Sequence, residues 1–163
     1  MQRIILILLG IGAIIAVVVG STAIGATRRD GTNAAVIAQP STAIVYTSPT
    51  CGCCANYIAY LKRVGYSVEV RSVDDAQLAA VKDDRGVPAT GRSCHTAEIA
   101  GYTIEGHVPV EAIDRLLAER PAVRGIGLAG MPSGSPGMPG TKTATFDVYA
   151  FATSSTMTPF GKF

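Results

Sequence analysis

The amino-acid sequence predicts an α/β fold, and three observations lead to this prediction. Short runs of β-branched and aromatic residues alternate with segments in which apolar residues recur at helical spacing. Glycine, proline or aspartate stands at the ends of most of these segments, as is typical of caps and turns. Apolar residues make up 48% of the 163 residues, which is enough for one packed core.

The first four elements are predicted to be strand, helix, strand and helix. The first helix places Tyr57, Ile58, Leu61 and Val64 on one stripe and stops at Gly65. The second helix turns Leu78 and Val81 inward, with Asp74 or Asp75 as its cap. In chain order, the four predicted elements are residues 43–47, 51–64, 68–73 and the segment that ends at Gly86.

A hairpin and a third helix complete the predicted core. The hairpin strands, 94–99 and 102–105, turn at Ala100-Gly101. Pro109 opens the last helix at a position where proline is tolerated, and Pro121 closes it. Strand–helix–strand followed by helix–hairpin–helix is the thioredoxin order. We therefore expect a thioredoxin-like central sheet flanked by helices.

The N-terminal segment differs from the rest of the chain. An uninterrupted apolar run from Ile4 to Val19 follows Arg3 and continues more weakly to Ile24. Such a run predicts a signal peptide or membrane anchor over residues 1–26. Arg28 and Arg29 follow the run, where positive charge favours the cytoplasm. We nevertheless expect an exported, periplasmic domain, with anchoring to the inner membrane slightly favoured over cleavage.

The rest of the chain divides into a linker, a domain and a tail. Residues 27–41 are polar and alanine-rich and are predicted as the linker. The domain is predicted over 42–152 and the tail over 153–163. Within the domain, 125–141 is rich in glycine and proline and is expected to be loop, whereas 146–151 alternates and is expected to add an edge strand.

The charge distribution excludes one class of function. Fourteen basic and twelve acidic residues leave a net charge of +2, and no stretch is densely basic. Because nucleic-acid binding requires a clustered basic face, we do not expect a nucleic-acid partner.

Three of the four cysteines stand together at the start of the first predicted helix, as Cys51-Gly52-Cys53-Cys54. Cys51 and Cys54 have the C-x-x-C spacing of redox pairs. The helix N-terminus would lower the pKa of the leading thiol, which favours both redox attack and metal binding. A redox dithiol has no use for the third sulfur of Cys53, whereas a soft-metal site gains from it.

Cys94 strengthens the metal interpretation. It follows Pro88 by six residues, and in a thioredoxin-like fold the preceding loop packs close to the helix that carries the cysteine motif. Four thiolates there would suit Cu(I) or Zn(II). Two alternatives stay open: an oxidoreductase in which Cys51 attacks and Cys54 resolves, and a disulfide-stapled interaction module. We favour a metal-binding protein over an enzyme.

Histidine and methionine supply further candidates near these cysteines. His95 adjoins Cys94, so on a strand its ring would point to the opposite face and would be packed or exposed rather than a ligand. His107 precedes a helix. It would either cap that helix or contact one of the metal ligands without binding the metal itself. Met131 and Met138 carry thioethers suited to Cu(I), in a loop that could fold over the site.

Several motifs stand together in this chain: 51–54 (CGCC), 86–88 (GVP), 93–96 (SCHT), 101–109 (GYTIEGHVP) and 130–138 (GMPSGSPGM). Together they resemble the CopG-like family of small exported proteins linked to copper resistance. The resemblance spans about residues 43–151. It implies a thioredoxin-like fold and copper held by Cys51, Cys53, Cys54 and Cys94. The expected function is sequestration or transfer of Cu(I), with bridging thiolates serving more than one ion and other copper-handling proteins as partners.

Overall fold

The structure is a computed structural model that describes residues 42–153 and 156–163. The predicted targeting segment and linker, residues 1–41, lie outside the described residues. Within the described part of the chain, none of the helices has the length and apolar character needed to cross a membrane.

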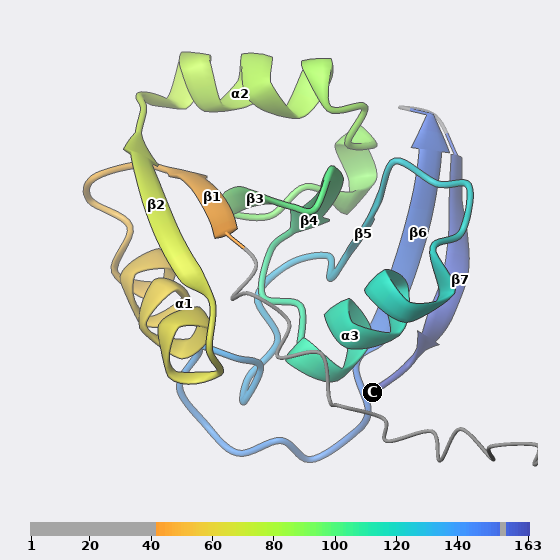
Figure 1. The fold of residues 1–163 in the computed structure, drawn as a ribbon. Helices are drawn as coiled ribbons and strands as arrows, with labels where there is room; N and C mark the ends of the chain where they lie inside the picture. Colours follow the sequence, from red (N-terminus) through yellow and green to blue (C-terminus); the bar gives the residue numbers. More distant parts are fainter. Residues whose placement is uncertain (1–41, 154–155) are drawn as a thin grey trace, which may run out of the picture. The chain divides into compact units, whose positions relative to one another are not determined.

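One seven-stranded sheet forms the centre of the domain (Figure 1). Its strand order is β2-β1-β3-β4-β5-β6-β7, with β1 parallel to β2, β4 parallel to β5, and the other neighbours antiparallel. The strands are β1 (Thr42–Thr47), β2 (Ser67–Ser72), β3 (His95–Ile99), β4 (Tyr102–Glu105), β5 (Gly125–Gly127), β6 (Asp147–Thr153) and β7 (Thr156–Lys162).

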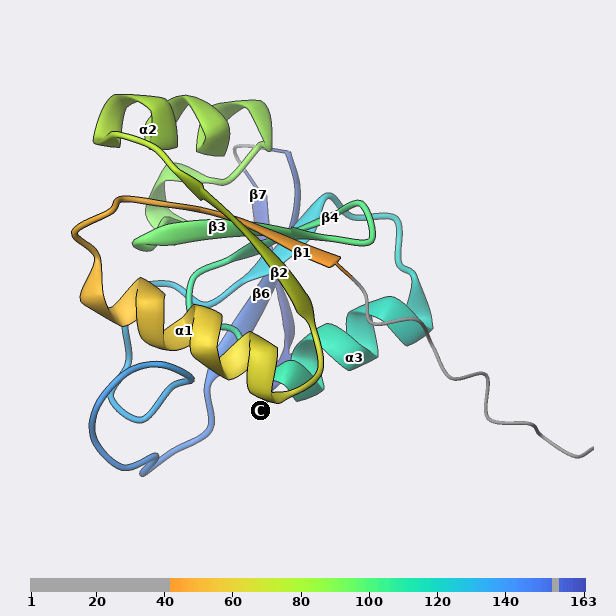
Figure 2. The ribbon, with the colours of Figure 1, turned by 60° about the vertical axis from the view of Figure 1, so that its left-hand side comes forward.

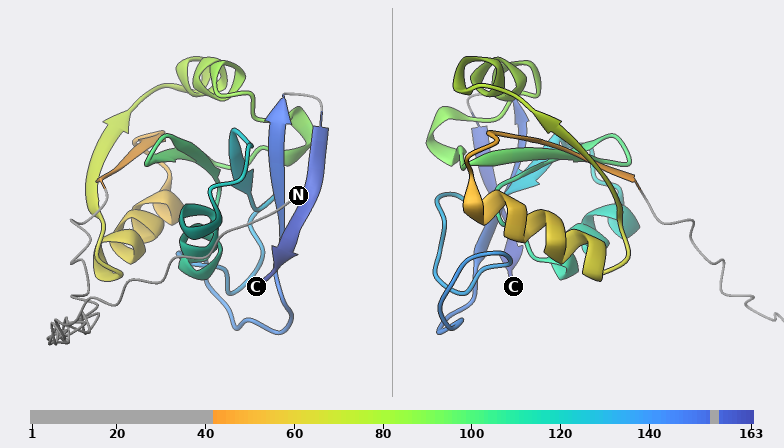
Figure 3. Two further views of the ribbon diagram at one scale, coloured as in Figure 1. Left: turned by 45° about the vertical axis from the view of Figure 1, so that its right-hand side comes forward. Right: turned by 90° about the vertical axis from the view of Figure 1, so that its left-hand side faces the viewer.

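Helices cover both faces of this sheet. Helices α1 (Gly52–Arg63) and α3 (Val110–Glu119) lie on one face, and α2 (Asp75–Asp84) lies on the other (Figure 2; Figure 3, right). A short 3₁₀ turn, Ala89–Gly91, precedes β3. The main core lies between the sheet, α1 and α3, where Tyr57 and Leu116 are fully buried. The structure thus confirms the α/β class, while the thioredoxin-like assignment stays a prediction.

Local signals explain where the helices begin and end. Asp74 caps α2 through a capping box: its side chain accepts from the backbone of Gln77, whose side chain accepts from the backbone of Asp74. Helix α1 begins after Cys51 without any side-chain cap and ends before Gly65, whose φ of +102° glycine adopts readily.

Two predicted inward positions differ in the structure. Val64 is 37% exposed, since α1 ends at Arg63 and Val64 is the C-cap residue rather than part of the buried stripe. In α2, Val81 is only half-buried, whereas its neighbour Lys82 is buried. The lysine can turn inward because Glu105 on β4 pairs with it.

The C-terminal part of the chain holds more strand than the sequence predicted. Gly125–Gly127, expected as loop, forms β5, and a Cβ at Gly125 would overlap the carbonyl of Thr103 on β4. The segment predicted as an edge strand, β6, lies inside the sheet, because β7 covers it. The stretch 153–163, predicted as a tail, includes β7, and Phe163 exchanges backbone hydrogen bonds with Phe146 (2.8 and 3.1 Å) while its ring packs against the core.

Candidate metal centre

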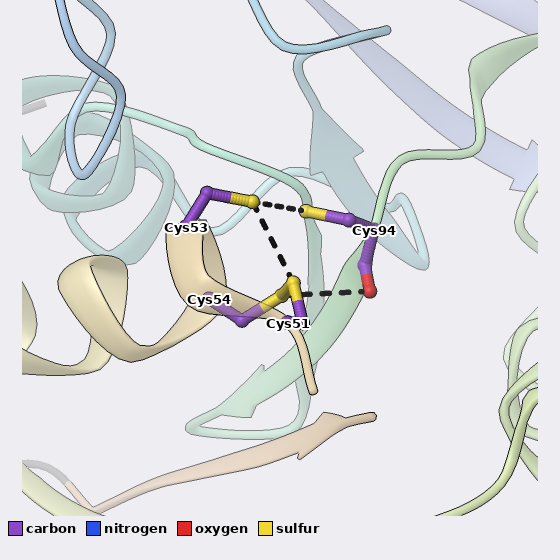
Figure 4. A group of neighbouring side chains, drawn as sticks. All are labelled: Cys51, Cys53, Cys54 and Cys94. Atoms are coloured by element: carbon purple, nitrogen blue, oxygen red, sulfur yellow. Dashed lines mark hydrogen bonds between the residues drawn. A yellow bond between two sulfur atoms is a disulfide. The ribbon is translucent and has the colours of Figure 1, made fainter. Parts of the chain in front are cut away.

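The first turn of α1 carries three of the sulfurs. Cys51 is the N-cap residue, held by a bond from its backbone N–H to Ser48 O at 3.2 Å, and Cys53 and Cys54 follow within the helix. Cys51 and Cys54 form a disulfide, with their Cα atoms 5.3 Å apart. Cys53 stays a free, partly exposed thiol because its side chain leaves the helix in another direction (Figure 4).

Cys94 faces this turn from the other side of the site (Figure 4). Its Sγ lies 3.5 Å from the Sγ of Cys53, which in turn lies 3.5 Å from that of Cys51. The Sγ of Cys54 is 3.7 Å from the carbonyl oxygen of Cys94. All four sulfurs lie within 4.8 Å of one another, so the structure brings together the four predicted ligands.

Both histidines adjoin Cys94. His95 Nδ1 lies 3.4 Å from the Cys94 sulfur and His107 Nε2 lies 3.2 Å from it, and the three ligand atoms form a second compact group. The expectation that the His95 ring turns away from Cys94 is wrong. Strand alternation does not apply to this pair, because β3 begins at His95 and Cys94 lies in the bend before it.

Hydrogen bonding fixes what His107 offers to the site. Its Nδ1 lies 2.7 Å from the carbonyl oxygen of Pro136, which can only accept, so Nδ1 carries the proton. The lone pair of Nε2 therefore faces Cys94 and is free for a thiol or a metal ion. His107 does not cap α3; the N-cap is Pro109, and the N–H of Val110 donates to the hydroxyl of Tyr60 at 2.8 Å. No pattern in the sequence indicates that last contact.

Burial controls the protonation of these groups. Burial lowers the pKa of His95 to about 3 and also lowers that of His107. Both imidazoles are therefore neutral at neutral pH and can donate a lone pair. Burial, with the nearby Cys53 thiol, raises the pKa of Cys94 to about 12. Cys94 is thus a thiol that must release its proton when it binds a metal.

The two methionines of the glycine- and proline-rich loop lie in different places. Met131 is 50% exposed, and its Sδ lies 3.8 Å from the Sγ of Cys53. The hydroxyl of Ser93 donates to Gly130 O at 2.7 Å, which ties this part of the loop to the residue before Cys94. Met138 instead lines a hollow against α1 with Tyr60 and Arg63. Of the two, Met131 is the one that the fold brings to the cysteines.

Comparison with known proteins places this centre in a family. Two solved structures of copper resistance protein CopG, Form 1 and Form 2, are similar to this chain, with 35% and 36% sequence identity and a TM-score of 0.67 each. Each comparison covers 76% of this chain and 98% of the solved one. The chain belongs to the CopG-like copper resistance family.

The other comparisons add the boundaries of a shorter match. A family model described as protein of unknown function, DUF411, matches residues 91–138, a segment that holds Cys94, both histidines and both methionines of the site region. No curated protein matches the chain. Membership of the CopG-like family and the four converging sulfurs together fit copper binding.

Proposed function

We propose that this protein binds Cu(I) through the thiolates of Cys51, Cys53, Cys54 and Cys94, and sequesters or passes on the ion outside the cytoplasm. The convergence of the four sulfurs within 4.8 Å carries the proposal. Thiolates are soft ligands that favour Cu(I). Two sulfurs that share one ion at bond lengths of about 2.3 Å lie roughly 4 Å apart, close to the 3.5 Å spacings of Cys53.

The number of ions follows from how the ligands are shared. Cys94 belongs both to the group of four cysteines and to the group with His95 and His107. A thiolate has more than one lone pair, so Cys94 can bridge ions held in the two groups. We therefore propose more than one Cu(I) per chain, with Met131 at the exposed side of Cys53 as a point of entry or exit.

The disulfide between Cys51 and Cys54 adds a redox requirement. Its reduction takes two electrons and two protons and yields two thiols, so a thiol reductant must act before all four sulfurs can bind. The reverse step supports a second candidate function. If the Cys51/Cys54 dithiol reduces two Cu(II) ions, it forms the disulfide, two Cu(I) ions and two protons. The same pair could instead exchange with partner disulfides.

The proposed location rests on the N-terminal apolar run from Ile4 to Val19, which is typical of targeting segments. It can be tested by fractionating cells that make the full chain and probing the periplasmic, membrane and cytoplasmic fractions. Recovery in the cytoplasm alone would contradict export.

Anaerobic Cu(I) titration with elemental analysis tests copper binding. We expect the reduced protein to retain at least one Cu(I) per chain, and the protein with its disulfide intact to retain less. Cys51→Ser/Cys54→Ser is the matched variant, because it removes the disulfide and two ligands together and should resemble the oxidised protein. A reduced protein that retains less than one copper per chain would contradict the proposal.

A different variant separates binding from redox turnover. Cys53→Ser/Cys94→Ser keeps the C-x-x-C pair and removes the other two sulfurs. If the main task is copper binding, this variant loses most of its Cu(I) affinity. If the main task is dithiol exchange, it keeps the rate at which the parent reduces a model disulfide, and the parent must show such a rate.

A further inference from the structure

A lysine and a glutamate form a buried ion pair behind the segment that carries Cys94. Lys82 comes from the last turn of α2 and Glu105 from the end of β4, and their side chains are 6% and 0% exposed. Lys82 Nζ donates to Glu105 Oε1 at 2.6 Å and to the hydroxyl of Thr96 at 2.9 Å. That hydroxyl in turn donates to Glu105 Oε2 at 2.7 Å.

The same carboxylate also holds the backbone beside Cys94. The N–H of Ser93 donates to Glu105 Oε1 at 2.6 Å. Glu105 thus binds Ser93, immediately before Cys94, and Thr96, immediately after His95. Its two oxygens accept hydrogen bonds from the residues on either side of the dipeptide Cys94-His95, whose side chains face Cys53 and His107.

A contribution to folding stability does not by itself explain why this ion pair is buried here. Two buried charges must each leave water, and a well-packed apolar replacement of both is often equally stable or more stable. The geometric result of the pair is more specific, because Glu105 binds the backbone N–H of Ser93 before Cys94-His95 and the side-chain hydroxyl of Thr96 after it. The Cys94 sulfur depends on that placement to reach Cys53 from a different element of the fold.

We propose that Glu105, held by Lys82 and Thr96, is a positioning residue that places Cys94 and His95 for metal binding. Its carboxylate fixes the Ser93 N–H, and Lys82 fixes the carboxylate. Loss of the hydrogen bond between Ser93 N–H and Glu105 lets the Cys94 segment shift. The affinity for the metal then falls, although every ligand stays present. This inference rests on the proposed copper function, but the placement of Ser93 can be measured without copper.

Two double variants test the proposal as a matched pair. Lys82→Met/Glu105→Gln and Lys82→Met/Glu105→Leu both remove both charges. Glutamine keeps an oxygen that can accept from Ser93 N–H, while its amide can donate to the Thr96 hydroxyl, and leucine keeps neither. The measurements are Cu(I) affinity of the reduced protein by chelator competition, hydrogen exchange of the Ser93 amide in the metal-free protein by NMR, and thermal unfolding.

We expect the leucine variant to lose at least tenfold in Cu(I) affinity and to exchange the Ser93 amide at least tenfold faster. The glutamine variant should stay within threefold of the parent in both. Equal behaviour of the two variants, whether both match the parent or both lose alike, would overturn the proposal. If the parent itself binds no copper, the proposed function fails, and the exchange rates still decide the positioning role.

A second pair covers the case in which the leucine variant does not fold. Ser93→Pro and Ser93→Ala both remove the hydroxyl, but only proline removes the N–H. Arg92 already has the extended backbone (φ −68°, ψ 143°) that a residue before proline adopts. The proline variant should lose at least tenfold in Cu(I) affinity relative to the alanine variant. Equal affinities would overturn the proposal.

Discussion

The sulfur of Cys94 lies 3.5 Å from the sulfur of Cys53, although 41 positions separate them in the chain. The sheet explains this approach. Thr47 at the end of β1 pairs with His95 at the start of β3, so the turn that leads into α1 begins beside the residue after Cys94. Strand pairing therefore sets which sulfurs meet.

Cys94→Ser is expected to weaken Cu(I) binding without unfolding the domain. Serine matches the size of cysteine at this partly exposed site, but its hydroxyl is a poor ligand for a soft ion. We expect at least a tenfold loss of affinity in competition with a Cu(I) chelator, with an unchanged far-UV circular dichroism spectrum.

Thr50→Ala is the control for this substitution. Thr50 precedes Cys51, and its exposed side chain contacts the hydroxyl of Ser48, so the change keeps all four sulfurs and the affinity should stay close to that of the parent. If Cys94→Ser binds Cu(I) as tightly as the parent, Cys94 is not a ligand.

Met131→Leu is expected to change the rate of copper transfer and leave the stoichiometry unchanged. Leucine keeps the size and apolarity of methionine but removes the thioether that lies 3.8 Å from Cys53. We expect at least a threefold change in the rate at which a chelator withdraws Cu(I). Met138→Leu is the matched control, because Met138 lies in the same loop but packs against α1. Equal rates for both variants and the parent would exclude a sulfur-dependent role for Met131.

The sequence predicted the elements that obey local rules and missed those that depend on distant partners. Capping and periodicity located α2, yet the inward turn of Lys82 depends on Glu105, which lies 23 residues away. Glycine suggested loop at 125–127. The strand forms there because Gly125 must approach β4 and Gly127 must leave room for the hydroxyl of Tyr149.

The same division holds for the site. Spacing and chemistry singled out the four cysteines, and the expected thioredoxin-like order of elements predicted that the helix start and the segment after Pro88 meet. The place of His95 was missed, since it depends on β3 beginning one residue after Cys94. The carboxylate that holds Ser93 was missed because it reaches the site from β4.

Cys94 is expected to react slowly with thiol reagents in the metal-free protein with its disulfide intact. Alkylation requires the thiolate, and burial raises the pKa of Cys94 to about 12 from an ordinary value of 9.0. We expect iodoacetamide to modify Cys94 at least tenfold more slowly than an unstructured cysteine peptide at pH 7.5, as followed by peptide mass spectrometry. The urea-unfolded protein is the control, because unfolding should remove the difference. A native rate equal to the peptide rate would contradict the raised pKa.

The stability of the metal-free, disulfide-intact protein is expected to fall with acidification from about pH 6.5 to about pH 3. Burial lowers the pKa of His95 from 6.5 to about 3 in the folded state, so the unfolded chain binds this proton first. Stability is therefore lost as the pH falls through this window, by at most about 1.4 kcal/mol per pH unit for one proton.

His95→Gln isolates this contribution, because it removes the titrating ring while every carboxylate and His107 stay in place. Urea unfolding at pH 7 and at pH 4 gives the free energy of unfolding at each pH, and the difference between the two is the quantity to compare. We expect that difference to be smaller in the variant by more than about 1 kcal/mol, since glutamine takes up no proton in either state. If parent and variant lose the same free energy of unfolding, His95 already titrates normally in the folded protein, and burial does not keep its ring neutral at acidic pH.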